Sequence, residues 1–183
     1  PLNKSTPEAI ENFRREIKTQ AQLDHPHLVR AYDAGEDGNV HFLVVEYVPG
    51  TDLRRLVRTH GKLTVQQASN FVKQAAEGLQ HAHDVDLIHR DIKPSNVFVG
   101  GDGAITLLDF GVASLVDANT RLTMSGQALG TLLYMAPEQV ERNEKVDHRA
   151  DIWAMGSLLY EAAYAKPPFR ESTSAGTLVA IML

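Results

Sequence analysis

The sequence predicts an α+β fold in which a small part containing strands precedes a larger part that is mostly helical. Apolar residues at helical spacing over about 7–21 follow Thr6, a residue typical of helix N-caps. Two short strands are expected around 28–34 and 40–46, joined by the turn-forming sequence Glu-Asp-Gly-Asn at 36–39. From about residue 52 onwards, the pattern is chiefly that of helices. A chain of 183 residues corresponds to one domain.

The larger part contains six expected elements. They are, in chain order, a short helix from near Asp52, a long helix over about 64–84, strands near 97–99 and 105–108, a buried helix over about 147–164 and a last helix from near Ser174. The long helix carries an apolar stripe, and Trp153 in the buried helix is expected in the core. We find no internal repeat and no low-complexity segment.

The composition excludes several functional classes. Apolar residues make up 43% of the chain, which is enough for a core. The net charge of −5 gives no indication of nucleic-acid binding. The absence of cysteine excludes disulfides and thiolate metal sites. No apolar stretch is long enough to cross a bilayer and no signal peptide is present, so we expect a cytoplasmic location without membrane contact in this segment. A membrane tether of the intact protein through a segment outside this one stays open.

Three motifs in the larger part point to one chemistry. Residues 89–96 read His-Arg-Asp-Ile-Lys-Pro-Ser-Asn, which matches five positions of the pattern H-R-D-x-K-x-x-N. At roughly 5% usage per residue type, this match arises by chance in about one chain of this size in ten thousand. Asp-Phe-Gly at 109–111 and Ala-Pro-Glu at 136–138 follow in order. The chain therefore resembles the eukaryotic-like (Hanks-type) serine/threonine protein kinases, most closely those of bacteria.

The resemblance implies a two-lobe protein-kinase-like fold that is truncated in both lobes. Residues 1–48 would form part of the small lobe, with the helix that kinases call αC, two strands and the hinge. Residues 49–183 would form part of the large lobe, with the catalytic loop, the activation segment and the buried helix. The family's glycine-rich loop and V-A-I-K strand do not occur in this sequence, and Lys4 stands in a loop context. We therefore expect an internal fragment of a catalytic domain, inactive by itself.

The resemblance also assigns the catalytic roles. Asp91 would orient the substrate hydroxyl and accept its proton, and Lys93 would lie beside the transferred phosphate. Thr131, within Gly-Thr-Leu-Leu-Tyr-Met at 130–135, would bridge Asp91 and Lys93. Asn96 and Asp109 would hold Mg²⁺, a cation that prefers oxygen ligands. The substrates implied are proteins with serine or threonine hydroxyls.

ATP is the implied second substrate, and the hinge would bind its adenine. Backbone groups of Glu46 and Val48 resemble those that contact the adenine edge, and Val45 would be a small gatekeeper. Asp52 could reach the ribose hydroxyls, but capping of the following helix explains this residue equally well. Lys93 would contact the phosphates.

Further residues are expected to support the site or regulate it. The resemblance implies three packing or backbone roles: His89 and Phe110 pack in an internal hydrophobic spine, and Gly111 provides backbone freedom. Two residues would form charge pairs, Glu16 with the strand lysine of the family and Arg90 with a phosphate on the activation segment. Glu138 would end the activation segment, and Asp151 would hold the backbone of the catalytic loop. Gln20 occupies the αC position of that spine, which is usually apolar. Thr120, Thr123 and Ser125 are either phosphorylation sites or ordinary loop residues, and the sequence leaves this open.

A pseudokinase or scaffold without chemistry is the alternative function. Pseudokinases commonly lose a catalytic residue, whereas Asp91, Lys93, Asn96 and Asp109 are all present. This favours the enzyme. The remaining histidines, His25, His27, His81 and His83 among them, show no metal-ligand spacing, and we assign them no function.

Overall fold

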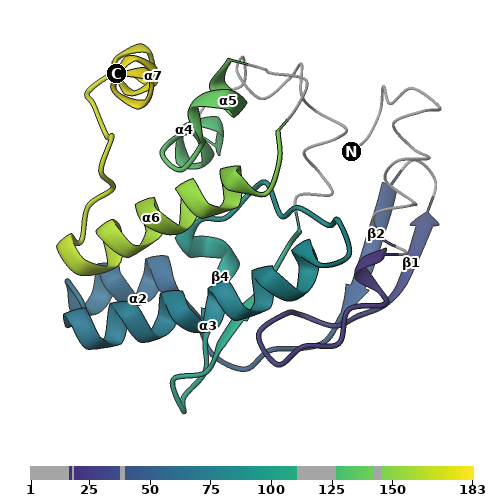
Figure 1. The fold of residues 1–183 in the computed structure, drawn as a ribbon. Coiled ribbons are helices and arrows are strands. Elements are labelled where there is room, and N and C mark those ends of the chain that lie inside the picture. The colour runs from purple at the N-terminus through teal and green to yellow at the C-terminus, as the bar shows by residue number, and fades with distance from the viewer. Residues whose placement is uncertain (1–16, 18, 38–39, 111–126, 142–145) are drawn as a thin grey trace.

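The computed structural model describes residues 17, 19–37, 40–110, 127–141 and 146–183. Two small antiparallel sheets and a set of helices make up this part of the chain (Figure 1). The predicted α+β class is confirmed. The helix expected over 7–21 lies mostly outside the described residues, of which Ile17, Thr19 and Gln20 are helical.

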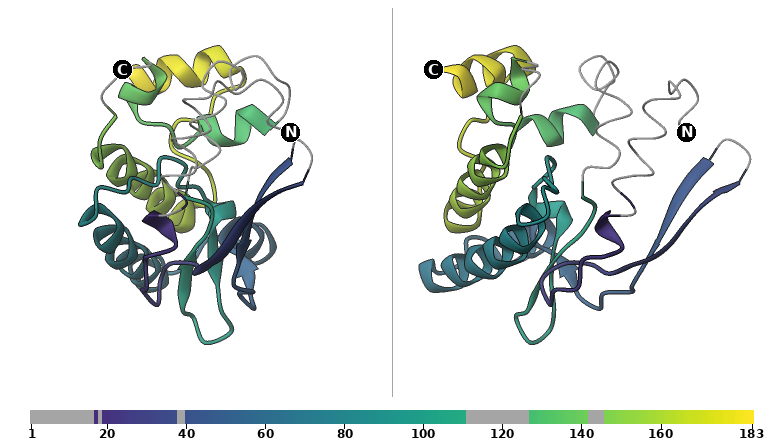
Figure 2. Two further views of the ribbon diagram at one scale, coloured as in Figure 1. Left: turned by 90° about the vertical axis from the view of Figure 1, so that its right-hand side faces the viewer. Right: turned by 45° about the vertical axis from the view of Figure 1, so that its right-hand side comes forward.

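The first sheet is a hairpin of β1 (Ala31–Asp37) and β2 (Val40–Val45), which projects away from the helices (Figure 2). Its register pairs Asp37 with Val40. The expected turn was wrong in part, because residues 36 and 37 belong to β1. The expected start of the first strand was also wrong, since residues 28–30 precede β1.

The backbone just before β1 pairs elsewhere. Leu28 forms a parallel bridge with Leu107, and the Val29 N–H donates to the Leu107 carbonyl at 2.9 Å. This long-range pairing takes these residues out of the hairpin, which local propensity could not show.

The second sheet has the order β3 (Thr51–Asp52), β4 (Val97–Val99) and β5 (Ile105–Leu107). The strand β3 was not predicted. Gly50 precedes it with φ 152°, and a Cβ on Gly50 would lie 2.4 Å from the Val99 carbonyl oxygen. Only glycine allows the backbone at residue 50 to approach the backbone of β4 this closely.

Two long helices, α3 (Val65–His83) and α6 (Arg149–Tyr164), pack side by side and carry the polar loop between α3 and β4. Thr64 and Gln67 form a capping box that begins α3, in which the backbone N–H of Gln67 donates to the Thr64 hydroxyl at 3.2 Å. The other helices are α2 (Leu53–His60), α4 (Gln127–Leu132), α5 (Pro137–Val140) and α7 (Ser174–Met182). The helices α4 and α5 were not predicted.

The core lies between α2, α3, α6 and the second sheet. Its fully buried members include Leu53, Ile92, Ile105, Leu107 and Leu158. No helix in the described ranges has the length and apolar character that a membrane crossing requires.

The expected burial of Trp153 was wrong. This side chain is only half-buried and stacks on Phe169, with ring centroids 5.2 Å apart. The buried face of α6 passes instead through Asp151, Ala154 and Leu158, whose spacing of three and four residues fits one helical face.

Candidate active site

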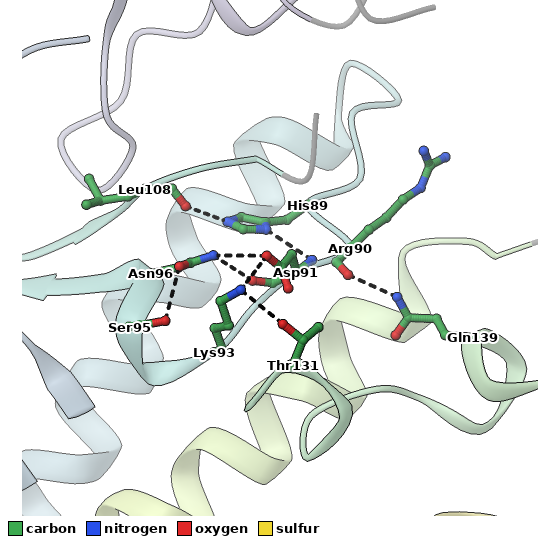
Figure 3. Close-up of polar contacts among 9 residues, drawn as sticks. All are labelled: His89, Arg90, Asp91, Lys93, Ser95, Asn96, Leu108, Thr131 and Gln139. Atoms are coloured by element: carbon green, nitrogen blue, oxygen red, sulfur yellow. Dashed lines mark hydrogen bonds and ion pairs between the residues drawn. The ribbon is translucent and has the colours of Figure 1, made fainter. Parts of the chain in front are cut away.

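The centre of the candidate site is the carboxylate of Asp91, in the loop between α3 and β4 (Figure 3). Its Oδ2 accepts a hydrogen bond from the Lys93 ammonium at 2.7 Å and lies 3.4 Å from the Asn96 amide nitrogen. Its Oδ1 is buried and has no partner among the described residues. Asp91 also lines a small cavity together with Thr131 and Tyr134. Oδ2 of Asp91 is therefore held in place by hydrogen bonds, while Oδ1 can still accept a hydrogen bond.

Asn96 is held with its oxygen available for a further contact. It ends the short 3₁₀ helix Pro94–Asn96, and its side-chain nitrogen donates to the Asp91 carbonyl at 2.9 Å. Its Oδ1 accepts from the Ser95 hydroxyl at 3.3 Å, which leaves a second lone pair. The amide orientation thus follows from its hydrogen bonds.

Lys93, rather than Thr131, forms the bridge in this part of the site, because it lies between Asp91 and Thr131. Its ammonium contacts Asp91 Oδ2 at 2.7 Å and the Thr131 hydroxyl at 3.2 Å. No direct hydrogen bond joins Thr131 to Asp91 among the described residues, so the expected geometry was wrong in this detail. Thr131 lies in α4, which brings the activation segment to the catalytic loop.

A buried carboxylate on α6 holds the backbone of the loop. Asp151 is 1% exposed, and its Oδ1 accepts from the Arg90 N–H at 2.8 Å. Its Oδ2 accepts from the His89 N–H at 2.9 Å and from His83 Nε2 at 2.8 Å. Arg90 has φ 62°, a left-handed conformation that is uncommon for residues other than glycine.

The carbonyl side of the same residue is also held, since Gln139 in the turn of α5 donates its side-chain amide to the Arg90 carbonyl at 3.0 Å. The unusual backbone of Arg90 is therefore determined from both sides by hydrogen bonds from α6 and α5. Its side chain points away from Asp91 (Figure 3).

His83 is a supporting residue that sequence reasoning missed. It lies at the end of α3, with its side chain 13% exposed, and contacts Asp151 across 68 positions of sequence. Its spacing to other polar residues carries no motif, so no local signal could have found it.

His89 links the catalytic loop to the segment after β5. Its Nε2 donates to the Leu108 carbonyl at 3.0 Å, and its Nδ1 accepts from the Asp91 N–H at 3.4 Å. Its ring lies 4.7 Å from that of Phe110, which is buried. Complete burial lowers the pKa of His89, so the ring is neutral near pH 7.

Asp109 stands apart from the other polar groups. It is exposed, has φ 53°, and forms no hydrogen bond with Asp91 or Asn96 in the described part of the chain. No three acidic or imidazole groups among the described residues are arranged to hold a metal by themselves. The oxygen donors of Asn96 and Asp109 fit a hard cation such as Mg²⁺, which commonly binds through one or two carboxylates plus phosphate.

The segment after β2 leaves backbone groups open. The Glu46 N–H donates to the Arg30 carbonyl at 2.9 Å, and the Glu46 carboxylate accepts from the Arg30 N–H at 3.0 Å. The Glu46 carbonyl and the backbone of Val48 have no partner among the described residues. Asp52 caps α2, with Oδ1 accepting from the Arg55 N–H at 2.8 Å.

The remaining predicted residues divide into two groups. Glu16, Gly111, Thr120, Thr123 and Ser125 lie outside the described residues. Glu138, at the start of α5, is half-buried and forms no ion pair with a described residue.

Gln20 is an exception to the apolar packing of the core. It is 1% exposed, and neither its amide oxygen nor its amide nitrogen has a partner in the described part of the chain. A buried polar group without a hydrogen bond costs about 1–3 kcal/mol.

We expect Gln20→Leu to raise the free energy of unfolding by about 1–3 kcal/mol, because it removes an unpaired amide and keeps a similar volume. Urea denaturation of the full-length protein at pH 7.5 measures the effect. Gln66→Leu, an exposed position on α3, is the matched control and should change stability little. Destabilisation by Gln20→Leu would show that the amide has a partner in solution.

The fold and this site define a protein kinase, and comparison with known proteins agrees. The chain belongs to the protein kinase family, whose domain it matches over residues 2–182. It is 39% identical over 161 residues to the serine/threonine-protein kinase PknB of Mycobacterium leprae, covering 86% of this chain and 26% of that protein. It is 38% identical over 162 residues to PknB of Mycobacterium tuberculosis, with the same coverage of 86% and 26%.

A corynebacterial relative shows the same partial coverage. A probable PknB of Corynebacterium glutamicum is 39% identical over 168 residues, covering 89% of this chain and 26% of that protein. The chain thus spans about a quarter of the length of these relatives.

Proposed function

We propose that the full-length protein transfers the γ-phosphoryl group of ATP to serine and threonine hydroxyls of other proteins. The observation that carries this proposal is the Asp91 carboxylate, which has one oxygen bonded to Lys93 and the other buried and unpaired. An acceptor in this state is suited to receive the hydrogen of a hydroxyl group. Membership of the protein kinase family supports the same reaction.

The proposed step depends on positioning rather than on covalent chemistry by the protein. Asp91 Oδ1 accepts a hydrogen bond from the substrate hydroxyl and so orients its oxygen for attack on the γ-phosphorus. As the new phosphorus–oxygen bond forms, the bond from the γ-phosphorus to the bridging oxygen breaks, ADP leaves, and Asp91 receives the proton of the hydroxyl. Lys93 keeps Asp91 in place through Oδ2, and its ammonium places positive charge beside the transferred group. Thr131 accepts a hydrogen bond from Lys93 and so couples the activation segment to this arrangement.

Mg²⁺ would neutralise phosphate charge when ATP is bound, with Asn96 and Asp109 as its protein ligands. Lys93 would contact the phosphates. The open carbonyl of Glu46 and the backbone of Val48 would bind the adenine edge, and the ribose would meet Asp52 through the oxygen that does not cap α2. In the same proposal, residues 1–48 belong to the small lobe and 49–183 to the large lobe, and this part of the protein acts in the cytoplasm, with or without a membrane tether elsewhere in the protein.

We expect the 183-residue chain by itself to show no useful phosphotransfer, because its sequence has no glycine-rich loop and no strand lysine to hold the phosphates. The test measures transfer of radiolabelled phosphate to a generic basic protein, with the chain and the full-length protein side by side. Strong transfer by the 183 residues alone would contradict this expectation. Absence of transfer by the full-length protein under activating conditions would instead favour a scaffold.

A further inference from the structure

The segment from His25 to Val29 is attached to the large helical part by close backbone contacts. The Leu107 N–H of β5 donates to the His27 carbonyl at 2.9 Å. On the α3 side, a Cβ added to Gly78 would lie 3.1 Å from the His27 carbonyl oxygen, so the backbone of α3 is in close contact with the 25–29 segment. This joint precedes β1 and pairs directly with the strand that leads to Asp109.

Three imidazole rings cover the joint. The His25 ring lies 5.3 Å from the His81 ring in a stacked arrangement and 5.4 Å from the His27 ring in an edge arrangement. His25 Nδ1 accepts the backbone N–H of His27 at 3.2 Å. This hydrogen bond requires a lone pair on Nδ1 and therefore a neutral His25.

The charged groups that face the cluster come from α3. His27 Nε2 lies 3.7 Å from a Glu77 carboxylate oxygen, and the other Glu77 oxygen is 3.7 Å from Lys73. From β5, the Ile105 carbonyl accepts a hydrogen bond from His27 Nδ1 at 2.8 Å. Imidazole side chains take up a proton near pH 6.5, so the charge of this cluster can change close to neutral pH.

We propose that His25, His27 and His81 form an acid-sensitive clasp that holds the 25–29 segment on α3 and β5 at neutral pH and releases it as the pH falls. The proton adds to Nδ1 of His25. The new Nδ1–H of His25 then faces the backbone N–H of His27, which at neutral pH donates to the lone pair of Nδ1. The added proton also puts a positive charge against two other imidazoles.

The direction of the pH dependence follows from the surroundings of His25. Burial lowers its pKa most, the neighbouring His27 and His81 lower it further, and Glu77 opposes them. The folded state then binds the proton less readily than the unfolded state. The stability that the clasp contributes is complete at pH values above the pKa of a histidine in the unfolded state, about 6.5. It is lost as the pH falls below that pKa.

The consequence reaches the segment that carries Asp109. Release of the 25–29 segment removes two hydrogen bonds of Leu107: its N–H donates to the His27 carbonyl, and its carbonyl accepts from the Val29 N–H. The amides of Val29 and Leu107 should then exchange faster, while those of β4 and β3 keep their partners.

Hydrogen exchange of the full-length protein at pH 7.5 and pH 5.5, corrected for intrinsic rates, tests the proposal. We expect protection of the Val29 and Leu107 amides to fall on the order of tenfold at the lower pH. His25→Asn keeps an acceptor at the place of Nδ1 but cannot take up a proton, so its protection should be independent of pH. His60→Asn on α2 is the control and should behave like the wild type.

A pH-dependent loss that persists unchanged in His25→Asn would overturn the proposal and assign the effect to another group, such as the buried His89. A second measurement covers a variant that fails to fold. In the wild type, the imidazole of His25 followed by nuclear magnetic resonance should titrate below pH 6.5, together with the loss of protection. Titration at or above 6.5 would overturn the proposal.

Discussion

Replacing Asp91 by asparagine is expected to lower the turnover number of the full-length protein by about 10²–10⁴-fold, the contribution typical of a general base. The change keeps the volume of the side chain and an acceptor for Lys93, so the melting temperature should stay close to that of the wild type. What is lost is the charge on Oδ1, the buried oxygen that has no protein partner among the described residues.

The measurement is steady-state phosphotransfer to a serine-containing peptide, with thermal unfolding of the same samples. Asp86→Asn is the matched control, since Asp86 is exposed, precedes the loop and has a left-handed φ of 59° that asparagine tolerates. If Asp91→Asn kept most of its turnover at an unchanged melting temperature, the role assigned to Asp91 would be contradicted.

Asp109→Asn is also expected to lower the turnover number. In addition, this variant should require a higher Mg²⁺ concentration to reach its maximal rate.

The second large effect is expected on stability, at Asp151. Asp151→Leu leaves the amides of His89 and Arg90 buried without acceptors, each at a cost of about 1–3 kcal/mol. The free energy of unfolding should therefore fall by about 2–6 kcal/mol. This is a large part of the 5–15 kcal/mol that typically stabilises a domain.

Urea denaturation at pH 7.5 measures the loss. Asp151→Asn keeps one oxygen acceptor and should lie between the wild type and Asp151→Leu. His83→Ala removes a third hydrogen bond to the same carboxylate and should cost less than Asp151→Leu, because the two amides keep their acceptor. Asp84→Leu, an exposed carboxylate at the end of α3, is the control. A change no larger than this control in Asp151→Leu would show that the loop does not depend on Asp151.

The hydrogen bonds of Asp151 also explain how the site is built. Arg90 adopts a left-handed backbone conformation directly before Asp91, and its two peptide groups are held by α6 and by Gln139. Because a backbone residue in this conformation costs of order 1–3 kcal/mol, the surrounding contacts must supply the difference. We therefore expect the catalytic loop to lose its arrangement when α6 is displaced, even if the residues 89–96 are unchanged.

The sequence by itself determined the features that depend on neighbouring residues. The residue types at 89–96 identified the family, because the chemistry of the loop needs them at this short spacing. The helix α3 followed from its apolar stripe, which gave its bounds as about 64–84. The strands β4 and β5 followed from short apolar runs between turn residues.

Only the tertiary structure decided the contacts between distant positions. It placed Leu28 beside Leu107 and half-buried Trp153 against Phe169, and it joined His83 to Asp151. The physical reason is the same in each case. Periodicity and capping describe which face of an element is apolar and where it begins, but the partner of a buried polar group is fixed by packing between elements that the sequence separates by tens of residues.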